Sequence, residues 1–114
     1  MKTIKNKPDL EKALEGDYVM VDCTATWCGP CKKIAPKIEE LSKKEEYNEV
    51  NFYVYDIDDD DELTEEYIEV IPTFLFFKDG ELVSKVTGAD YKSVVKKLDE
   101  MLEESSSSDE EGSE

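Results

Sequence analysis

DCTATWCGPC, residues 22–31, lies between an apolar run and a stretch rich in lysine and glutamate. The run before it, residues 18–21 (YVMV), is typical of a buried strand. The stretch after it has isoleucine and leucine at spacings of four and three, which predicts an amphipathic helix. We therefore expect Cys28 and Cys31 at a strand-to-helix junction, with the pair wrapped onto the first turn of the helix.

The position of the two cysteines favours redox chemistry. A helix start has unpaired backbone N–H groups and about half a positive charge, and both stabilise a thiolate. We therefore expect Cys28 to ionise more readily than free cysteine and to act as the nucleophile. Two intervening residues bring Cys31 close enough, across one turn, to form and open a disulfide. Cys28 would attack a disulfide in a partner protein, and Cys31 would then resolve the mixed disulfide.

Composition narrows the function classes. The chain has 114 residues, of which 39% are hydrophobic, so we expect one domain that buries roughly 60–70% of its unfolded surface. It has 14 lysines against 30 acidic residues, a net charge of −16, and no arginine or histidine. Such a surface repels nucleic acid and anionic lipid and would steer the protein toward neutral or basic partners. The alternative is that the charge only keeps the protein soluble and monomeric. The lack of histidine excludes Ser-His and Cys-His catalytic arrangements.

Cysteine usage bears on metal binding and on the cell compartment. Three cysteines without histidine are too few for a four-ligand zinc site, so we expect no metal, although a site shared between two chains stays open. No run of about 18 apolar residues and no leader-like segment is present, which predicts neither a membrane span nor export. We therefore expect a reducing compartment, the cytoplasm, where a CxxC pair is more often catalytic or metal-binding than structural.

The rest of the chain alternates predicted strands and helices, with a hairpin turn at residues 78–80 (KDG). The predicted order is β-α-β-α-β-α-β-β-α, an α/β fold with a mixed central sheet of about five strands and four flanking helices. We expect strands at residues 2–4, 18–24, 51–57, 74–77 and 81–86. We expect helices over 8–14 with Pro8 in the first turn, from the cysteine pair onward, after 58–62, and over 91–102 capped by Asp90.

Several local features have more than one interpretation. Pro36 lies within the helix that follows the cysteines and is expected to bend it rather than end it. The acidic run at residues 58–62 is interpreted as a solvated turn before a capped helix, because it lacks the glycine and spaced glutamate of a calcium loop. Cys23 is expected to pack in the core, with regulation by its oxidation as the alternative.

The last twelve residues, 103–114, differ in composition from the preceding chain. They include no apolar side chain, so we expect a disordered acidic, serine-rich tail after a domain at residues 1–102. Serines beside acidic residues are candidate sites for an acid-directed kinase, and an inert solubilising tail is the alternative.

Several of these residues together resemble the motifs of thioredoxins. Trp27–Cys31 (WCGPC) matches the family's active-site motif residue for residue, and Asp22 lies where the family has a buried aspartate. Ile71–Thr73 resembles its cis-proline segment, and Val86–Ala89 includes its final-strand glycine. The resemblance runs in order over about residues 1–102 and implies a thioredoxin fold.

The resemblance also implies an activity and partners. A thioredoxin is a protein-disulfide reductase that serves electron transport and cell redox homeostasis, and an NADPH-dependent thioredoxin reductase recycles it. The family implies that Cys28 is exposed and Cys31 shielded. Asp22 lies in an otherwise apolar strand, so we expect burial to raise its pKa, and the family implies that it deprotonates Cys31 through water. A buried aspartate with only a structural hydrogen bond is the alternative. We expect no bound cofactor, because no glycine-rich phosphate loop is present.

The family further implies a groove for the partner's peptide beside the disulfide. The Ile71–Pro72 bond is expected to be cis, and Gly29 and Pro30 would tune the redox potential. The residues expected to contact substrate are Trp27, Gly29, Pro30, Val70, Ile71, Pro72, Gly88 and Ala89.

Three positions differ from many relatives. Cys23 and Thr24 replace bulkier residues, and Val54 or a neighbouring tyrosine stands where some relatives have lysine or glutamate near the aspartate. Two other functions stay open. One is a thioredoxin-fold binding module whose redox activity is incidental. The other is a disulfide-isomerase-like domain, although that group usually has histidine where Pro30 lies.

Overall fold

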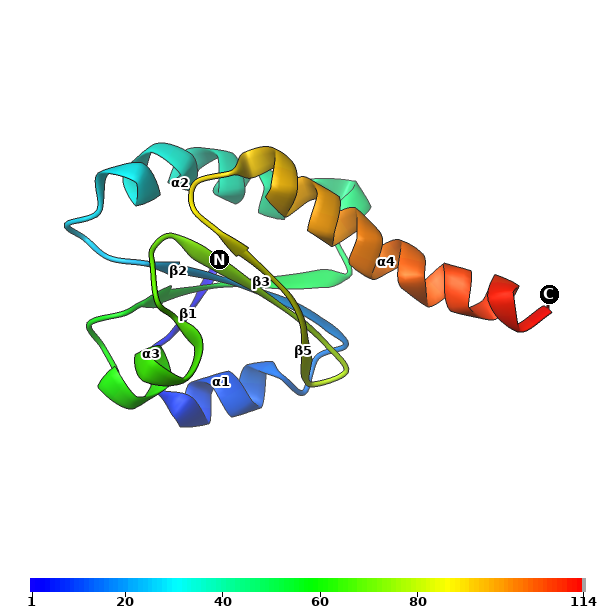
Figure 1. Ribbon diagram of the computed structural model, residues 1–114, viewed down its shortest axis with the longest axis horizontal. Coiled ribbons are helices and arrows are strands. Elements are labelled where there is room, and N and C mark those ends of the chain that lie inside the picture. The colour runs from blue at the N-terminus through cyan, green and yellow to red at the C-terminus, as the bar shows by residue number, and fades with distance from the viewer. Residues whose placement is uncertain (114) are drawn as a thin grey trace.

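The computed structural model describes the backbone of residues 1–113 and the side chains of residues 1–103. Within that part the chain forms a five-stranded sheet between two pairs of helices, as the sequence predicts (Figure 1). The elements are β1 (Lys2–Ile4), α1 (Lys7–Ala13), β2 (Tyr18–Thr24), α2 (Gly29–Ser42), a 3-10 turn (Glu45–Tyr47), β3 (Val50–Asp56), α3 (Asp61–Tyr67), β4 (Thr73–Lys78), β5 (Glu81–Thr87) and α4 (Tyr91–Ser113).

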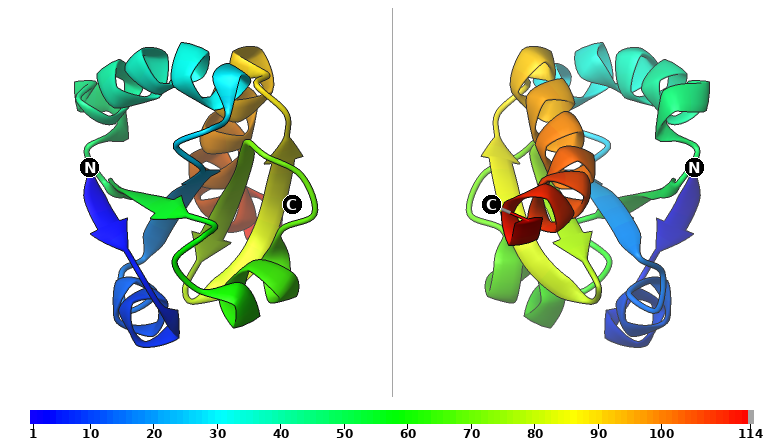
Figure 2. Two further views of the ribbon diagram at one scale, coloured as in Figure 1. Left: turned by 90° about the vertical axis from the view of Figure 1, so that its left-hand side faces the viewer. Right: turned by 90° about the vertical axis from the view of Figure 1, so that its right-hand side faces the viewer.

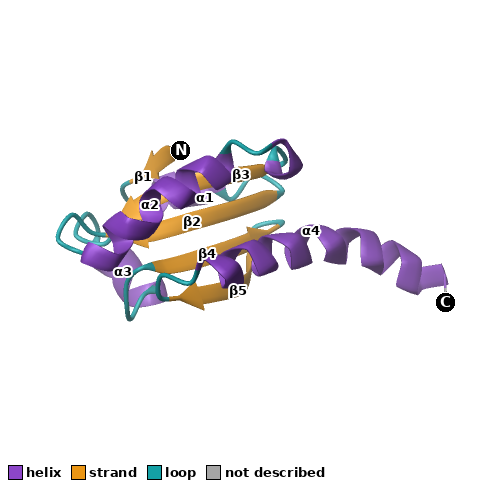
Figure 3. Cartoon of the chain, turned by 90° about the horizontal axis from the view of Figure 1, so that it is seen from above, coloured by secondary structure: helices purple, strands orange, loops and turns teal. Residues whose placement is uncertain are grey.

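The sheet is mixed, with strand order β1-β3-β2-β4-β5 (Figure 3). β3 runs parallel to both β1 and β2, whereas β4 is antiparallel to β2 and to β5. β2 is therefore the central strand, and the cysteine-bearing segment leaves from its C-terminal end. The predicted parallel first half and antiparallel end are both confirmed.

The helices cover the two faces of the sheet in pairs. α2 and α4 lie on one face, and α1 and α3 lie on the other (Figures 1 and 2). Alternate residues of β2 supply the two cores, because successive side chains of a strand point to opposite faces. Met20 packs with residues of α2 and α4, whereas Val19, Val21 and Cys23 pack with residues of α1 and α3. This division confirms the predicted central strand covered on both sides.

Helix starts follow the capping residues. Asp60 accepts a hydrogen bond from the Leu63 N–H at the start of α3, and Asp90 accepts one from the Ser93 N–H at the start of α4. Both predicted caps are confirmed. α1 begins at Lys7, one residue before its predicted start, because the Asn6 side chain accepts the Asp9 N–H at 2.9 Å and caps the helix there.

Two further sequence predictions concern proline and glycine. α2 continues past Pro36 for six residues, so the proline does not end it, as predicted. In the hairpin between β4 and β5, Asp79 has φ 51° and Gly80 has φ 82°. Two consecutive positive φ values are the geometry of a tight turn that matches strand twist, so the predicted hairpin is confirmed.

The predicted tail, residues 103–114, falls on the last turns assigned to α4 and on Glu114. Its side chains beyond Glu103 lie outside the described residues, as does Glu114 altogether, so its disorder stays a prediction. In the part of the chain that is described, no helix is long and apolar enough to cross a membrane.

Candidate active site

The two cysteines lie at the start of α2, where the sequence places them. Cys28 is the N-cap residue in an extended conformation, and its Sγ accepts a hydrogen bond from the Cys31 N–H at 3.3 Å. A disulfide joins Cys28 to Cys31, whose Cα atoms are 5.3 Å apart. A backbone N–H that donates to the Cys28 sulfur stabilises negative charge there when the disulfide opens. The site therefore combines a reversible disulfide with a donor for a thiolate.

The expected exposure of Cys28 is wrong for this disulfide-bonded pair. Cys28 is only 6% exposed and Cys31 3%. Ala25 packs with both cysteines, and the partly buried Ile57 and Ile71 pack against that cluster. These neighbours come from the end of β2, the segment after β3 and the segment before β4, so tertiary packing covers the first cysteine almost as fully as the second.

Asp22 lies in the middle of the central strand, as expected. It is 5% exposed, and its partners in the sheet are Val54 on β3 and Phe74 on β4. Burial in these surroundings raises the pKa of the Asp22 carboxyl to about 7. The carboxyl can therefore gain or lose a proton near neutral pH.

The segment before β4 meets the end of β5 beside the cysteines. The Ile71–Pro72 peptide bond is cis, which confirms the expectation from the resemblance. The Gly88 N–H donates to the Pro72 carbonyl at 2.8 Å, and Gly88 adopts φ 89°, a conformation that favours glycine. The Thr73 hydroxyl donates to the Val70 carbonyl at 2.6 Å and closes the turn before the strand. These bonds bring together three of the predicted substrate-contacting positions.

Trp27 presents a large apolar side chain next to Cys28. It is 65% exposed, and Val70 is 52% exposed, which suits the expected contact with a partner. The Trp27 indole N–H donates to the Asp58 carboxylate at 2.9 Å. The sequence interpretation treats Asp58 only as part of a solvated turn and misses this contact, since 31 residues separate the pair.

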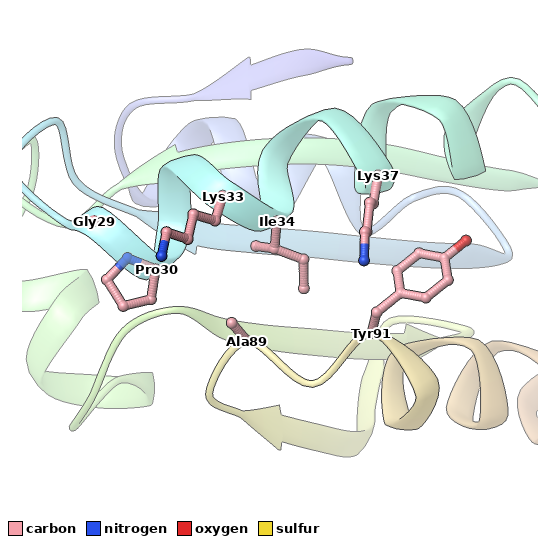
Figure 4. Close-up of a pocket in the computed structure, with 7 residues that line it drawn as sticks. All are labelled: Gly29, Pro30, Lys33, Ile34, Lys37, Ala89 and Tyr91. Carbon is pink, nitrogen blue, oxygen red and sulfur yellow. The ribbon is translucent and has the colours of Figure 1, made fainter.

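The other predicted substrate residues lie on another side of the site. Gly29, Pro30 and Ala89 line an open groove of about 450 Å³ between α2 and the start of α4 (Figure 4). Lys33 and Lys37 of α2 also line it and are missed by the sequence interpretation, although their i, i+4 spacing places both on one helix face.

Cys23 is buried in the core below α1 and α3, as expected. Burial raises the pKa of its thiol well above the ordinary value, and the charge of Asp22 raises it further. The Cys23 thiol is therefore protonated and unreactive. Among the side chains that are described, no group of three or more Cys, Asp or Glu residues is placed to hold a metal ion.

Comparison with known proteins agrees with this geometry. The family model described as Thioredoxin matches residues 3–100. A thioredoxin of Aspergillus fumigatus is 49% identical over 82 residues, which are 70% of this chain and 74% of the relative. A thioredoxin of Geodia cydonium is 44% identical over 100 residues, 83% of this chain and 92% of the relative. The X-ray structure of Fasciola hepatica thioredoxin superposes with a TM-score of 0.82 at 37% identity and covers 89% of this chain and 99% of that one.

The family match covers residues 3–100 of the chain, and the relatives above are named thioredoxins. A disulfide at a helix start beside an exposed tryptophan is suited to exchange with disulfides of other proteins. The chain belongs to the thioredoxin family, and it is a thiol–disulfide oxidoreductase that reduces disulfides in partner proteins.

Proposed function

We propose that Cys28 is the attacking cysteine and Cys31 the resolving one. The observation that carries this assignment is the Cys31 N–H, which donates to the Cys28 sulfur at the N-cap of α2. That donor and the positive end of the helix stabilise the Cys28 thiolate, whereas Cys31 lies one turn inside the helix. The exposed Trp27 beside Cys28 supports approach of the partner from the side of the first cysteine.

The exchange proceeds in two steps. The Cys28 thiolate attacks one sulfur of the partner's disulfide, which forms a mixed disulfide and releases the other partner sulfur as a thiolate that takes up a proton. The Cys31 thiolate then attacks the Cys28 sulfur, forms the Cys28–Cys31 bond and releases the second partner sulfur. Two electrons pass from the dithiol of this chain to the partner.

Asp22 is proposed to take the proton from Cys31 before the second step. Two properties of the Asp22 carboxyl support this role: it is buried in the strand that leads to the cysteines, and its pKa is about 7. A base with this pKa is half-ionised near neutral pH and can both accept a proton and return it.

The proposed source of electrons is a thioredoxin reductase that draws on NADPH. The oxidised Cys28–Cys31 pair requires two electrons after each turnover, and the family supports a protein donor. The proposed location is the cytoplasm, because a dithiol that reduces other proteins needs a reducing compartment to be regenerated.

Trapping of the mixed disulfide tests the two cysteine roles. We expect Cys31→Ser to accumulate a covalent complex with an oxidised partner such as insulin, because no second thiol is left to resolve it. Cys28→Ser should form none, since the attacking sulfur is gone. Non-reducing electrophoresis and mass spectrometry measure both complexes, and equal trapping by the two variants would contradict the assignment. Regeneration of the wild-type dithiol by purified thioredoxin reductase and NADPH tests the proposed donor.

A further inference from the structure

The groove beside the disulfide is lined by positive charge, although the protein as a whole is strongly negative. Its lining includes Lys33 and Lys37 of α2, and Figure 4 shows the Lys37 side chain pointing toward Tyr91 and the Lys33 side chain ending beside Pro30. The Lys37 Nζ lies over the Tyr91 ring, 5.7 Å from its centroid. Neither lysine forms an ion pair with any residue whose side chain is described. The groove therefore presents two ammonium groups, neither of which is paired with a carboxylate among the described side chains.

Acidic side chains are missing from the immediate lining. The groove is lined by glycine, proline, isoleucine, alanine and tyrosine besides the two lysines. Residues 27–38, which lead into and form the first turns of α2, include three lysines and no aspartate or glutamate. Asp90 follows Ala89 outside this lining. Its carboxylate accepts the Ser93 hydroxyl at 2.7 Å and the Ser93 N–H at 3.1 Å as the cap of α4, and these bonds lower its pKa, so Asp90 adds one negative charge beside the two lysines.

This local charge opposes that of the whole molecule. The net charge is −16, yet at physiological salt the screening length is only about 8 Å. A segment seated in the groove therefore responds mainly to the two lysines beside it. The apolar floor, formed by Pro30, Ile34 and Ala89, adds contact for the stems of the bound side chains.

We propose that this groove binds an acidic segment of the oxidised partner, next to the partner cysteine that Cys28 attacks. Gly29 and Pro30 line the groove and stand between the two active-site cysteines, so a chain bound there is continuous with the reacting disulfide. The preferred substrates are disulfides flanked by glutamate or aspartate. The inference rests on the proposed function, because it names the class of substrate that the same cysteines reduce.

The test uses three synthetic peptides with the same internal disulfide. One has two glutamates next to a cysteine, the second has glutamines there and the third lysines. Each is mixed with the pre-reduced full chain, and the second-order rate constant of a single turnover is measured at low and high salt. We expect the glutamate peptide to react about fivefold faster than the glutamine peptide, with a preference that high salt removes.

Two double variants locate the preference. Lys33→Gln with Lys37→Gln should bring the ratio of glutamate to glutamine rate constants to about one. Lys43→Gln with Lys44→Gln removes the same charge at the other end of α2, where both lysines are exposed, and should keep the wild-type ratio. Circular dichroism and urea unfolding establish that each variant is folded, and the single change Lys37→Gln should give an intermediate ratio.

Each outcome has one meaning. Equal rates for the glutamate and glutamine peptides in the wild type, or faster reaction of the lysine peptide, would overturn the inference and leave the disulfide reductase intact. A preference that survives the Lys33 and Lys37 changes, or is lost equally with those at Lys43 and Lys44, would also overturn it. Failure of the wild-type dithiol to reduce any of the peptides would instead count against the proposed function.

Discussion

Asp22 is the one acidic side chain that is buried among those the structure describes. Its apolar neighbours on β3 and β4 offer no positive charge, so burial acts alone and raises the pKa of the carboxyl to about 7. Between the ordinary pKa of 3.8 and the folded value, the folded chain holds a proton that the unfolded chain releases. The folded state is therefore favoured at low pH, and this contribution is lost as pH rises through about 7.

The change Asp22→Asn tests this linkage. In the wild type, the free energy of unfolding should include a part from Asp22 that falls by on the order of 2–3 kcal/mol between pH 5 and pH 8. Asparagine does not titrate, so the variant should lose this dependence and be more stable than the wild type at pH 8. Urea unfolding at a series of pH values measures the difference.

Asp59→Asn is the control, because Asp59 is exposed in the turn before α3. Its unfolding curves should follow those of the wild type at each pH. Asp22→Asn should also remove the inflection near pH 7 from the rate of disulfide reduction while leaving formation of the mixed disulfide unchanged. A pH profile identical to that of the wild type would argue against the proton role of Asp22.

The hydrogen bond from Trp27 to Asp58 holds the exposed indole beside the cysteines. Asp58→Ala removes the acceptor of the indole N–H, which is 2.9 Å away, and should let the side chain rotate more freely. We expect the KM for a protein disulfide to rise about two- to tenfold, which is the range of one hydrogen bond. Asp58→Asn keeps an acceptor oxygen and should change KM less.

Fluorescence reports on the same contact, because Trp27 is the one tryptophan in the chain. Its steady-state anisotropy should fall in Asp58→Ala and stay near the wild-type value in Asp58→Asn. An unchanged anisotropy and KM in the alanine variant would mean that the contact does not hold the indole.

At the scale of elements, the ends of the helices and strands follow local chemistry. Asn6, Asp60 and Asp90 each accept a backbone N–H from the first turn of a helix. Cys28 does so with sulfur, so the residue that caps α2 is also the proposed nucleophile. Structure and reactivity therefore depend on the same helix start.

The hairpin between β4 and β5 allows a prediction for one glycine. Gly80 has φ 82°, and an added Cβ would lie 3.6 Å from the Leu14 carbonyl oxygen, which is an ordinary contact. Gly80→Ala should therefore lower the free energy of unfolding by about 1 kcal/mol through backbone strain alone. Gly80→Asn should cost less, because asparagine tolerates positive φ better than alanine. Urea denaturation measures both, and an equal loss would indicate a steric rather than a conformational cause.

At the scale of the whole molecule, negative charge is in large excess over positive charge. The chain has 30 acidic residues against 14 lysines. Its described side chains form two ion pairs, Lys7–Glu66, which is exposed, and Lys97–Glu100, which is partly exposed. Exposed pairs contribute little, so most of the negative charge repels itself in the folded state.

Salt should therefore stabilise this protein. Raising NaCl from about 0.02 M to 0.5 M shortens the screening length several-fold and should increase the free energy of unfolding by on the order of 1 kcal/mol, about 4–8 °C in Tm for a domain of ~100 residues. KCl at the same ionic strength is the control and should act equally. A Tm that stays constant or falls with NaCl would show that self-repulsion is not a major cost of folding.

The sequence by itself determined the type and order of the elements, the start of α2 at the cysteines and the aspartate caps of α3 and α4. These features depend on hydrophobic period, capping residues and turn residues, all of which act between neighbours in the chain. The resemblance of WCGPC, Asp22 and Pro72 to thioredoxin motifs added the family and the cis proline.

Only the tertiary structure decided the strand order, the cover that Ala25, Ile57 and Ile71 place over the cysteines, and the bond from Trp27 to Asp58. It also placed Lys33 and Lys37 across a groove from Ala89 and Tyr91. Each of these contacts joins residues far apart in the chain. Which residues meet in this way depends on which faces of the helices and strands pack against each other. The sequence pattern within either segment does not contain that information.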